Sequence, residues 1–310
     1  MKPQLAADAV ISSVQYPTIL QPKIDGVRAL SINGTLTGRS LDPFKGFGIT
    51  EYWSKPEFKY LDGEMTLGAD AASSERLCSL TTGALGAFKG VTSMADVYLH
   101  CFDWLAEPNL PYSQRYEMLK AYVEKLDHPR VKLVPSYVAN NREELDVLVA
   151  KFFDAGYEGA IIRNPRSRLK EGRPTKEGQL WRIKGWMDSE MLVTGFTEGQ
   201  TNTNEAKTNT LGRTERSSAK DGMVPNGMVG SIHGTMIGDC FHPITGEKLF
   251  AEGLPITIGT GTMTDAELLD YFKHPEKLVG HPVKFKHLAH GVKSLPRMGN
   301  YISHRLKEDM

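Results

Sequence analysis

The chain has 310 residues, and its 37 lysines and arginines balance 37 aspartates and glutamates, so the formal net charge is zero. That length suits two compact domains better than one. Hydrophobic residues make up 40% of the chain and charged residues 24%, as in ordinary globular proteins. No apolar run approaches the roughly 18 residues of a membrane span, and the amino-terminal segment lacks a secretory pattern. We therefore expect an intracellular, cytoplasmic protein with no membrane partner.

Local charge is strongly biased although the total is zero. Residues 159–184 contain eight basic and two acidic side chains. Binding of a phosphate-rich ligand responds to the local field rather than to the total charge. A charge run alone is most often a solvated face, so motifs must decide what this segment does.

The first part of the chain mixes short strands with helices. A β-hairpin is predicted at Val27–Ile32 and Thr35–Gly38, because the intervening Asn33-Gly34 is a strong signal for a tight turn. Other short segments rich in β-formers or aromatic residues predict strands at Leu61–Leu67, Val97–Leu105, Gly159–Arg163, Leu180–Lys184 and Met191–Phe196.

Two amphipathic helices are predicted between these strands. Their apolar stripes have the i, i+3, i+4, i+7 spacing of a buried helix face and consist of Leu119, Tyr122, Val123 and Leu126 in one helix and Leu145, Leu148, Val149 and Phe152 in the other. Asn141 with Glu144 resembles a capping box, and Gly156 suits the end of the second helix. Without regular βαβ alternation, this pattern predicts an α+β domain of antiparallel sheets over residues 1–188.

The composition changes after Phe196. From Gln200 to Asn226 the chain is polar and has too few apolar residues to bury a core, which predicts a long loop or insertion. Further strands and a helix opened by Thr264 and Glu267 are predicted beyond it, the strands at Gly230–Ile237, Pro255–Gly259 and Pro282–His287. Residues 189–310 are therefore expected to form a small β-barrel with one helix.

A chemically specific cluster lies just ahead of the hairpin. Lys23, Asp25, Gly26 and Arg28 fall within six residues. A lysine that acts as a nucleophile must lose its proton, and a nearby guanidinium or bound metal favours that loss. The cluster is equally compatible with an exposed start of a strand, so the rest of the chain decides between the two interpretations.

The cluster and the motifs after it resemble the covalent nucleotidyltransferases, specifically the small ATP-dependent DNA ligases of viral and phage type. Lys23 to Arg28 matches that family's nucleophile motif Lys-x-Asp-Gly-x-Arg. Later matches follow in the family's order and are Thr37-Gly38-Arg39-Ser40, Asp62-Gly63-Glu64, Cys101-Phe102-Asp103, Glu158 to Arg163, and Gly172 to Gly178. The resemblance covers nearly the whole chain.

The resemblance implies a role for each matching residue. Lys23 would attack the α-phosphate of ATP and become lysyl-AMP, with pyrophosphate leaving in line. Glu64 and Glu158 are oxygen ligands suited to Mg²⁺, or Mn²⁺ in its place, with Asp25 as an outer contact. Phe102 would stack on adenine, its alternative being a core aromatic. The other residues implied at the nucleotide or its phosphates are Gln21, Arg28, Arg39, Arg163, Arg173, Arg182 and Lys184.

The last adenylation motif departs from the family, which usually has Lys-x-Lys where this chain has Arg182-Ile183-Lys184. On a strand, residues 182 and 184 point to one face, so both cations can converge on one phosphate. Arginine offers a wide fork and lysine a compact point charge. Which of the two contacts the α-phosphate stays open.

The remaining residues are sufficient for an oligonucleotide-binding (OB) barrel. The resemblance implies that a polar loop at about residues 200–228 contacts duplex DNA, with Arg39 close to the nick phosphate and further contacts from Lys207, Arg213, Arg216 and Lys220. A surface loop without a partner is the alternative. Arg297 and Arg305 resemble the family's terminal motif, and their role stays open.

These observations predict an ATP-dependent DNA ligase, a monomer that seals 3′-OH/5′-phosphate nicks in duplex DNA through lysyl-AMP and a DNA-adenylate. Such an enzyme serves DNA replication or repair, here in the host cell of a phage or virus. The alternative is an RNA ligase or a GTP-dependent capping guanylyltransferase with the same lysine chemistry. Intact Lys23, Glu64 and Glu158 argue against a binding module with a dead nucleotide pocket.

Overall fold

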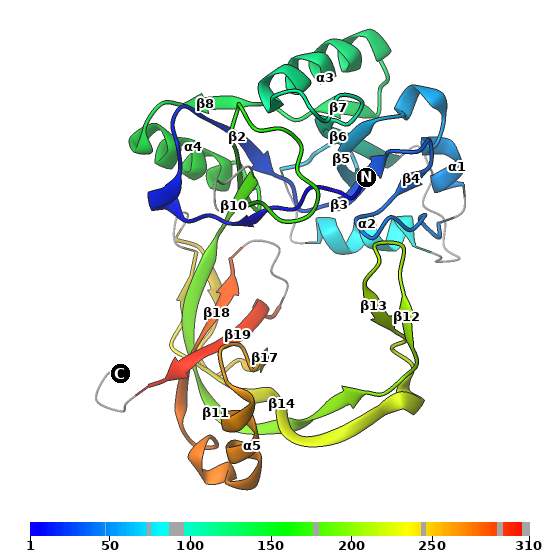
Figure 1. Ribbon diagram of the computed structural model, residues 1–310. Helices are drawn as coiled ribbons and strands as arrows, with labels where there is room; N and C mark the ends of the chain where they lie inside the picture. Colours follow the sequence, from blue (N-terminus) through cyan, green and yellow to red (C-terminus); the bar gives the residue numbers. More distant parts are fainter. Residues whose placement is uncertain are drawn as a thin grey trace. The chain divides into compact units, whose positions relative to one another are not determined.

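The computed structural model describes residues 1–46, 48–72, 76–86, 96–175, 180–242, 246–289 and 294–305. The chain divides into two compact units, Met1–Lys184 and Gly185–Met310 (Figure 1). Their mixture of sheets and helices confirms the predicted α+β class. Among the described residues, no helix has the length and apolar character needed to cross a membrane.

One sheet of the first unit carries the predicted hairpin. Its strand order is β4-β3-β5-β6-β7, with bounds Leu36–Thr37, Val27–Ser31, Leu61–Leu67, Val97–Trp104 and Val131–Leu133. Only the β6–β7 pair is parallel. Helices α1 (Ile49–Trp53), α2 (Leu77–Leu85) and α3 (Tyr112–Leu126) contact this sheet. Its core includes Trp53, Leu61, Met65, Leu99 and Leu119.

The second sheet of this unit is built around β2, a strand that the sequence did not predict. The order is β1-β10-β9-β2-β8, with bounds Ala7–Asp8, Leu180–Lys184, Gly159–Arg163, Thr18–Lys23 and Tyr137–Ala139. Helix α4 (Arg142–Asp154) packs on β2, β8 and β9. The chain passes from β2 into β3 within three residues, so the two sheets meet directly behind Lys23.

Local sequence signals are confirmed in this unit. The hairpin pairs Leu30 with Thr37 and turns through Gly34 at φ +80°, which a glycine adopts without steric cost. Asn141 caps α4, because its side chain accepts a hydrogen bond of 2.8 Å from the Glu144 backbone N–H. Only this half of the predicted capping box forms, since the Glu144 side chain accepts from the backbone N–H of Asn140. The predicted apolar stripes of α3 and α4 face the core: Leu119, Leu145 and Phe152 are buried, and the other stripe residues are partly buried and pack against it.

The second unit contains a closed five-stranded barrel, as predicted. Its strand order is β11-β14-β17-β19-β18, with bounds Trp186–Asn202, Met223–Ile237, Pro255–Gly259, Arg297–His304 and Pro282–Leu288. Helix α5 (Asp265–Lys273) is capped by Thr264, which forms the predicted capping box with Glu267. Met191, Ile232, Ile258, Val283 and Phe285 lie in the barrel core. A separate short ribbon pairs β15 (Cys240–Phe241) with β16 (Lys248–Phe250).

The polar segment after residue 200, predicted as a long loop or insertion, is an insertion that forms a hairpin and not an unstructured loop. β11 and β14 stay paired as far as Asn202 and Met223, and β12 (Ala206–Thr208) pairs with β13 (Thr214–Arg216) beyond them (Figure 1). Asn204 braces the ribbon by donating to the carbonyls of Ser217 and Ala219. Backbone pairing needs no apolar side chains, and every residue of β12 and β13 is exposed. The alternation that reveals a half-buried strand is therefore missing.

Candidate active site

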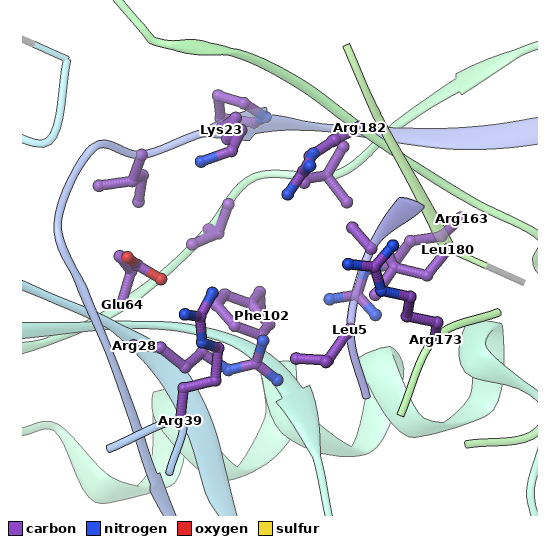
Figure 2. A pocket seen from close by; sticks show the side chains of 15 residues that line it. Leu5, Lys23, Arg28, Arg39, Glu64, Phe102, Arg163, Arg173, Leu180 and Arg182 are labelled. Atoms are coloured by element: carbon purple, nitrogen blue, oxygen red, sulfur yellow. The ribbon is translucent and has the colours of Figure 1, made fainter. Parts of the chain in front are cut away.

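A pocket in the first unit lies where its two sheets meet, and most of its polar lining is cationic (Figure 2). The sheet of β2, β9 and β10 contributes Lys23, Arg163 and Arg182, and the other sheet contributes Arg28, Glu64 and Phe102. Arg39 and Arg173 reach the pocket from loops. With six cationic side chains against the single carboxylate of Glu64, the lining favours a ligand rich in negative charge.

One buried carboxylate holds two lysines beside this pocket. The register pairs Lys23 with Gly159 and Gly159 with Lys184, so the lysines flank the same point of β9. Glu158 directly precedes Gly159. Its side chain, 3% exposed, accepts a hydrogen bond from Lys23 and lies 2.7 Å from Lys184 Nζ. The sheet register therefore places both ammonium groups on one carboxylate.

The two glutamates of the site have opposite electrostatic environments. Burial raises the pKa of Glu158, but the adjacent Lys23 and Lys184 outweigh burial and leave the pKa below its ordinary value. Burial also dominates at Glu64, where the neighbouring cations compensate only in part, and the pKa rises to about 7. Glu158 is therefore a stable counter-ion, whereas Glu64 can accept a proton near neutral pH.

Arg28 is fixed as a bidentate fork. Its Nε and Nη2 donate hydrogen bonds of 2.6 Å to the two carboxylate oxygens of Asp62. The guanidinium lies over the Phe102 ring, 4.8 Å from its centroid. The turn before Arg28 requires glycine, because a Cβ on Gly26 would lie 2.2 Å from the Met65 carbonyl oxygen. Such locked geometry suits recognition of a ribose or phosphate oxygen.

A buried polar network supports the floor of the pocket. Arg163 donates to Gln21 Oε1 (2.9 Å) and to Asp103 (3.2 Å), and Arg115 donates to both oxygens of Asp103. Arg163, Asp103 and Arg115 are each at most 6% exposed. The Nε2 amide of Gln21 is buried and has no hydrogen-bond partner among the described residues. That donor is available to a ligand that reaches it.

The predicted metal ligands do not form a cluster by themselves. Within the described ranges, no group of three or more histidine, cysteine, aspartate or glutamate side chains could hold a metal ion. Asp25 is buried at 6% exposure and is not part of the pocket lining. Mg²⁺ is commonly held by one or two carboxylates together with substrate phosphates. Glu64 and Glu158 fit that donor set, because a nucleotide would complete it.

A family model now identifies the chain. The model described as "ATP dependent DNA ligase domain" matches residues 3–184, which is more than half of the chain and includes every residue of the pocket. The chain belongs to the ATP-dependent DNA ligase domain family. The resemblance inferred from the motifs of Lys23, Glu64, Phe102 and Glu158 is thereby confirmed.

Relatives of the family extend the comparison. The DNA ligase of African swine fever virus (isolate Warthog/Namibia/Wart80/1980) is 25% identical over 191 residues, covering 59% of this chain and 45% of the relative. The chain thus spans less than half the length of the curated relatives it matches.

Solved structures match over almost the whole chain. A Chlorella virus DNA ligase-adenylate is 26% identical, with a TM-score of 0.51, and the match covers 100% of this chain and 99% of the other. A structure from a study of Lig E DNA ligases has a TM-score of 0.67 at 18% identity, covering 98% and 99% of the two chains. This second likeness supports the fold alone, a mixed α+β unit followed by a unit that contains a closed five-stranded barrel.

The structure brings most of the predicted ligase residues together. Lys23, Arg28, Arg39, Glu64, Phe102, Arg163, Arg173 and Arg182 line the pocket. Gln21 and Glu158 bind the lining residues Arg163 and Lys23, and Lys184 binds Glu158. Lys176, from the predicted basic loop, lies outside the described residues.

The remaining predicted cations lie in the second unit. Lys207, Arg213, Arg216 and Lys220 are exposed on or beside the hairpin, and Arg305 forms an ion pair of 2.6 Å with Glu190. Arg297 begins β19.

Sequence reasoning missed the partners that hold these residues in place. Asp62 and Asp103 lie inside recognised motifs, but nothing indicated which arginines they would bind. The position of Arg115 in the sequence does indicate a buried partner. It follows Tyr112 by three residues and precedes Leu119 by four, so it lies on the buried face of α3. A charged residue on such a face requires a buried counter-ion.

Proposed function

We propose that the protein is an ATP-dependent DNA ligase that seals 3′-OH/5′-phosphate nicks in duplex DNA through lysyl-AMP and a DNA-adenylate. The observation that carries this proposal is Lys23, held by Glu158 at the edge of a pocket lined by cations. Family membership over residues 3–184 supports the choice of ATP as the AMP donor. The unit 1–184 then acts as the adenylation domain, and 185–310 as the OB-fold domain.

In the first step the Lys23 nitrogen attacks the α-phosphorus of ATP. Lys23 lies on Glu158 as an ammonium, so it must first lose one proton to become the attacking amine. A nitrogen–phosphorus bond then forms, the bond to the pyrophosphate oxygen breaks, and the nitrogen loses a second proton. Burial raises the pKa of Glu64 to about 7 in the metal-free protein, but a Glu64 that holds the metal is not free to act as the base, so both protons leave to solvent. Lys184 remains on Glu158 when Lys23 leaves it, so the buried carboxylate keeps a counter-ion throughout the step.

The other pocket residues orient the nucleotide. We assign Phe102 to stack on adenine and the free Gln21 amide to reach a base acceptor. Arg28 suits the ribose or a phosphate, because its fork is already fixed by Asp62. Arg163, Arg173, Arg182 and Lys184 supply charge for the phosphates.

Mg²⁺, or Mn²⁺ in its place, would be held by Glu64 and Glu158, with Asp25 as an outer contact. When bound, such an ion neutralises charge on the phosphates and polarises them. The two glutamates fit the ion only in the presence of nucleotide, because Lys23 and Lys184 otherwise occupy both oxygens of Glu158.

Nicked duplex DNA is the proposed partner of a monomeric enzyme. Arg39 is exposed at the pocket and suits the nick phosphate, and the hairpin cations Lys207, Arg213, Arg216 and Lys220 suit the duplex backbone. AMP would then pass from Lys23 to the 5′-phosphate, and the 3′-hydroxyl would displace it. The similarity to viral DNA ligases supports an intracellular role in a host, in replication or repair.

One assay tests which nucleotide labels the protein and which nucleic acid the protein joins. Protein is incubated with α-labelled ATP or GTP and Mg²⁺, and then with nicked DNA or single-stranded RNA. We expect labelling by ATP alone and sealing of nicked DNA. Labelling by GTP alone would indicate a capping enzyme, and joining of RNA ends without nick sealing would indicate an RNA ligase.

A further inference from the structure

The amino-terminal segment 3–9 forms one wall of the nucleotide pocket. Leu5 and Ala6 line the pocket directly, and Figure 2 shows Leu5 at its wall. The backbone N–H of Leu5 donates to the Gly172 carbonyl at 2.7 Å, and Gly172 donates back to Pro3 at 3.1 Å. Further along, Ala9 donates to the Arg182 carbonyl at 2.9 Å. Backbone hydrogen bonds at both ends therefore fix the path of this segment.

Asp8 lies beside Arg182 through this pairing. Strand β1 runs parallel to β10, and the register opposes Asp8 to Arg182. The Asp8 carboxylate accepts a hydrogen bond of 2.7 Å from Nε of Arg182. The contact engages Nε, at the root of the guanidinium, and the Arg182 side chain points into the pocket (Figure 2).

An arginine at this position needs orientation that a lysine would not need. A lysine ammonium is a point charge with rotating donors, whereas a guanidinium is a planar fork whose donors work only in the correct plane. The motif resemblance implies a lysine at the position where this chain has Arg182. A carboxylate bound at Nε fixes the plane of the fork and leaves its outer nitrogens for a phosphate.

We propose that Asp8 is a positioning residue that orients the guanidinium of Arg182 toward the nucleotide phosphate. The proposal rests on the proposed function, because it concerns the rate at which Lys23 is adenylylated. The pair is 72% exposed at Asp8 and 35% exposed at Arg182, so a modest effect is expected.

A double-mutant cycle tests the orientation directly. The variants Asp8→Ala, Arg182→Lys and the double variant are compared with the parent by single-turnover lysyl-AMP formation at several ATP concentrations. We expect Asp8→Ala to slow the saturated rate about fivefold in the arginine background, the most that an exposed pair usually contributes. In the Arg182→Lys background the same change should alter the rate less than about twofold, because a lysine has no plane to orient. Asp8→Glu should recover part of the loss.

The control is another exposed ion pair of the same unit. Arg142 and Asp146 form a 2.7 Å contact on α4, remote from the pocket lining, so Asp146→Ala should not change the adenylylation rate. Equal effects of Asp8→Ala in both backgrounds, or no effect in either, would overturn the proposal. A parent protein that forms no lysyl-AMP would instead overturn the proposed function, so the two failures are distinguishable.

Discussion

Basic side chains occupy two contrasting regions of this molecule. In the pocket of the first unit, Lys23 and Arg28 bind carboxylates that are 3% and 2% exposed. In the hairpin of the second unit, Lys207 lies 3.7 Å from Glu205, and these side chains are 76% and 81% exposed. Lys23 and Arg28 in the pocket are therefore held by buried partners, whereas Lys207 in the hairpin lies beside an exposed one.

The difference determines what each region can contribute. A buried charge with a fixed partner acts through geometry, and its loss leaves a counter-ion unpaired in a medium where that is costly. An exposed charge is screened by salt and contributes little by itself, so exposed charges act mainly through how many of them there are. Single substitutions should therefore affect covalent chemistry and folding in the pocket, whereas the hairpin should affect DNA affinity as a group.

The largest effect is expected from Lys23→Ala, which should abolish labelling by ATP because the nucleophile is lost. Glu158 keeps Lys184 as a counter-ion, so the variant should remain folded. Lys207→Ala, in the hairpin, should be labelled like the parent. Both are measured by covalent transfer of α-labelled ATP.

The same variant should still seal nicks that were adenylylated beforehand, at a reduced rate. That step needs phosphate contacts and a metal but no nucleophilic lysine. Complete loss of this activity in a folded Lys23→Ala protein would give Lys23 a structural role instead.

Arg115→Ala should strongly destabilise the first unit. It leaves the buried Asp103 with one cationic partner, Arg163, in place of two, and loss of one partner of a buried pair typically costs about 3–5 kcal/mol. Arg142→Ala, which breaks an exposed pair on α4, is the matched control and should hardly change the unfolding midpoint. Urea unfolding followed by tryptophan fluorescence measures both. Similar midpoints for the two variants would show that burial does not distinguish these arginines.

Replacing residues 203–222 with a short Gly-Ser linker should weaken binding to a nicked duplex while leaving lysyl-AMP formation intact. Each lost phosphate contact should flatten the slope of log affinity against log salt by about 0.9. A second variant changes Lys207, Arg213 and Lys220 to glutamine and keeps the hairpin, which separates charge from shape. An unchanged salt slope in both would make the hairpin irrelevant to DNA.

The smallest effect concerns Glu64, whose pKa of about 7 lies above its ordinary value of 4.5. The folded protein therefore keeps a proton that the unfolded chain has lost, and stability should fall as pH rises from about 4.5 to about 7. In Glu64→Gln, the decrease in the free energy of unfolding over this pH range should be smaller than in the parent by about 1–3 kcal/mol. Thermal unfolding of the parent and of Glu64→Gln, both free of nucleotide and metal, measures the difference in stability between them at each pH. A difference that does not vary with pH would contradict the raised pKa.

Much of the fold could be predicted because local signals and tertiary packing agree. The strands Leu61–Leu67, Gly159–Arg163 and Leu180–Lys184 have the bounds that their composition predicted. The motifs around Lys23 and Glu158 gave the residues of the site, and the sheet register explains how they meet. These residues lie on neighbouring strands, so the geometry follows once the strands pair.

The parts that could not be predicted depend on pairings between distant segments. The bond between Asp8 and Arg182 follows from a parallel pairing of a two-residue strand, which leaves no periodic pattern. Arg115 and Asp103 are joined by the packing of α3 on β6. The hairpin has no buried face, so its strands carry no alternation. Patterns of apolar residues show which positions are buried. The two ion pairs and the hairpin depend instead on which strands and helices lie side by side, and apolar patterns do not show that.

The most direct test of the central claim is to locate the nucleotide on the protein. The parent protein is incubated with ATP and Mg²⁺, digested, and mapped by mass spectrometry for an adenylate joined through an acid-labile bond. The structure predicts one adduct, on the peptide that contains Lys23. An adduct on Lys184, or a protein that never becomes adenylylated, would contradict this account.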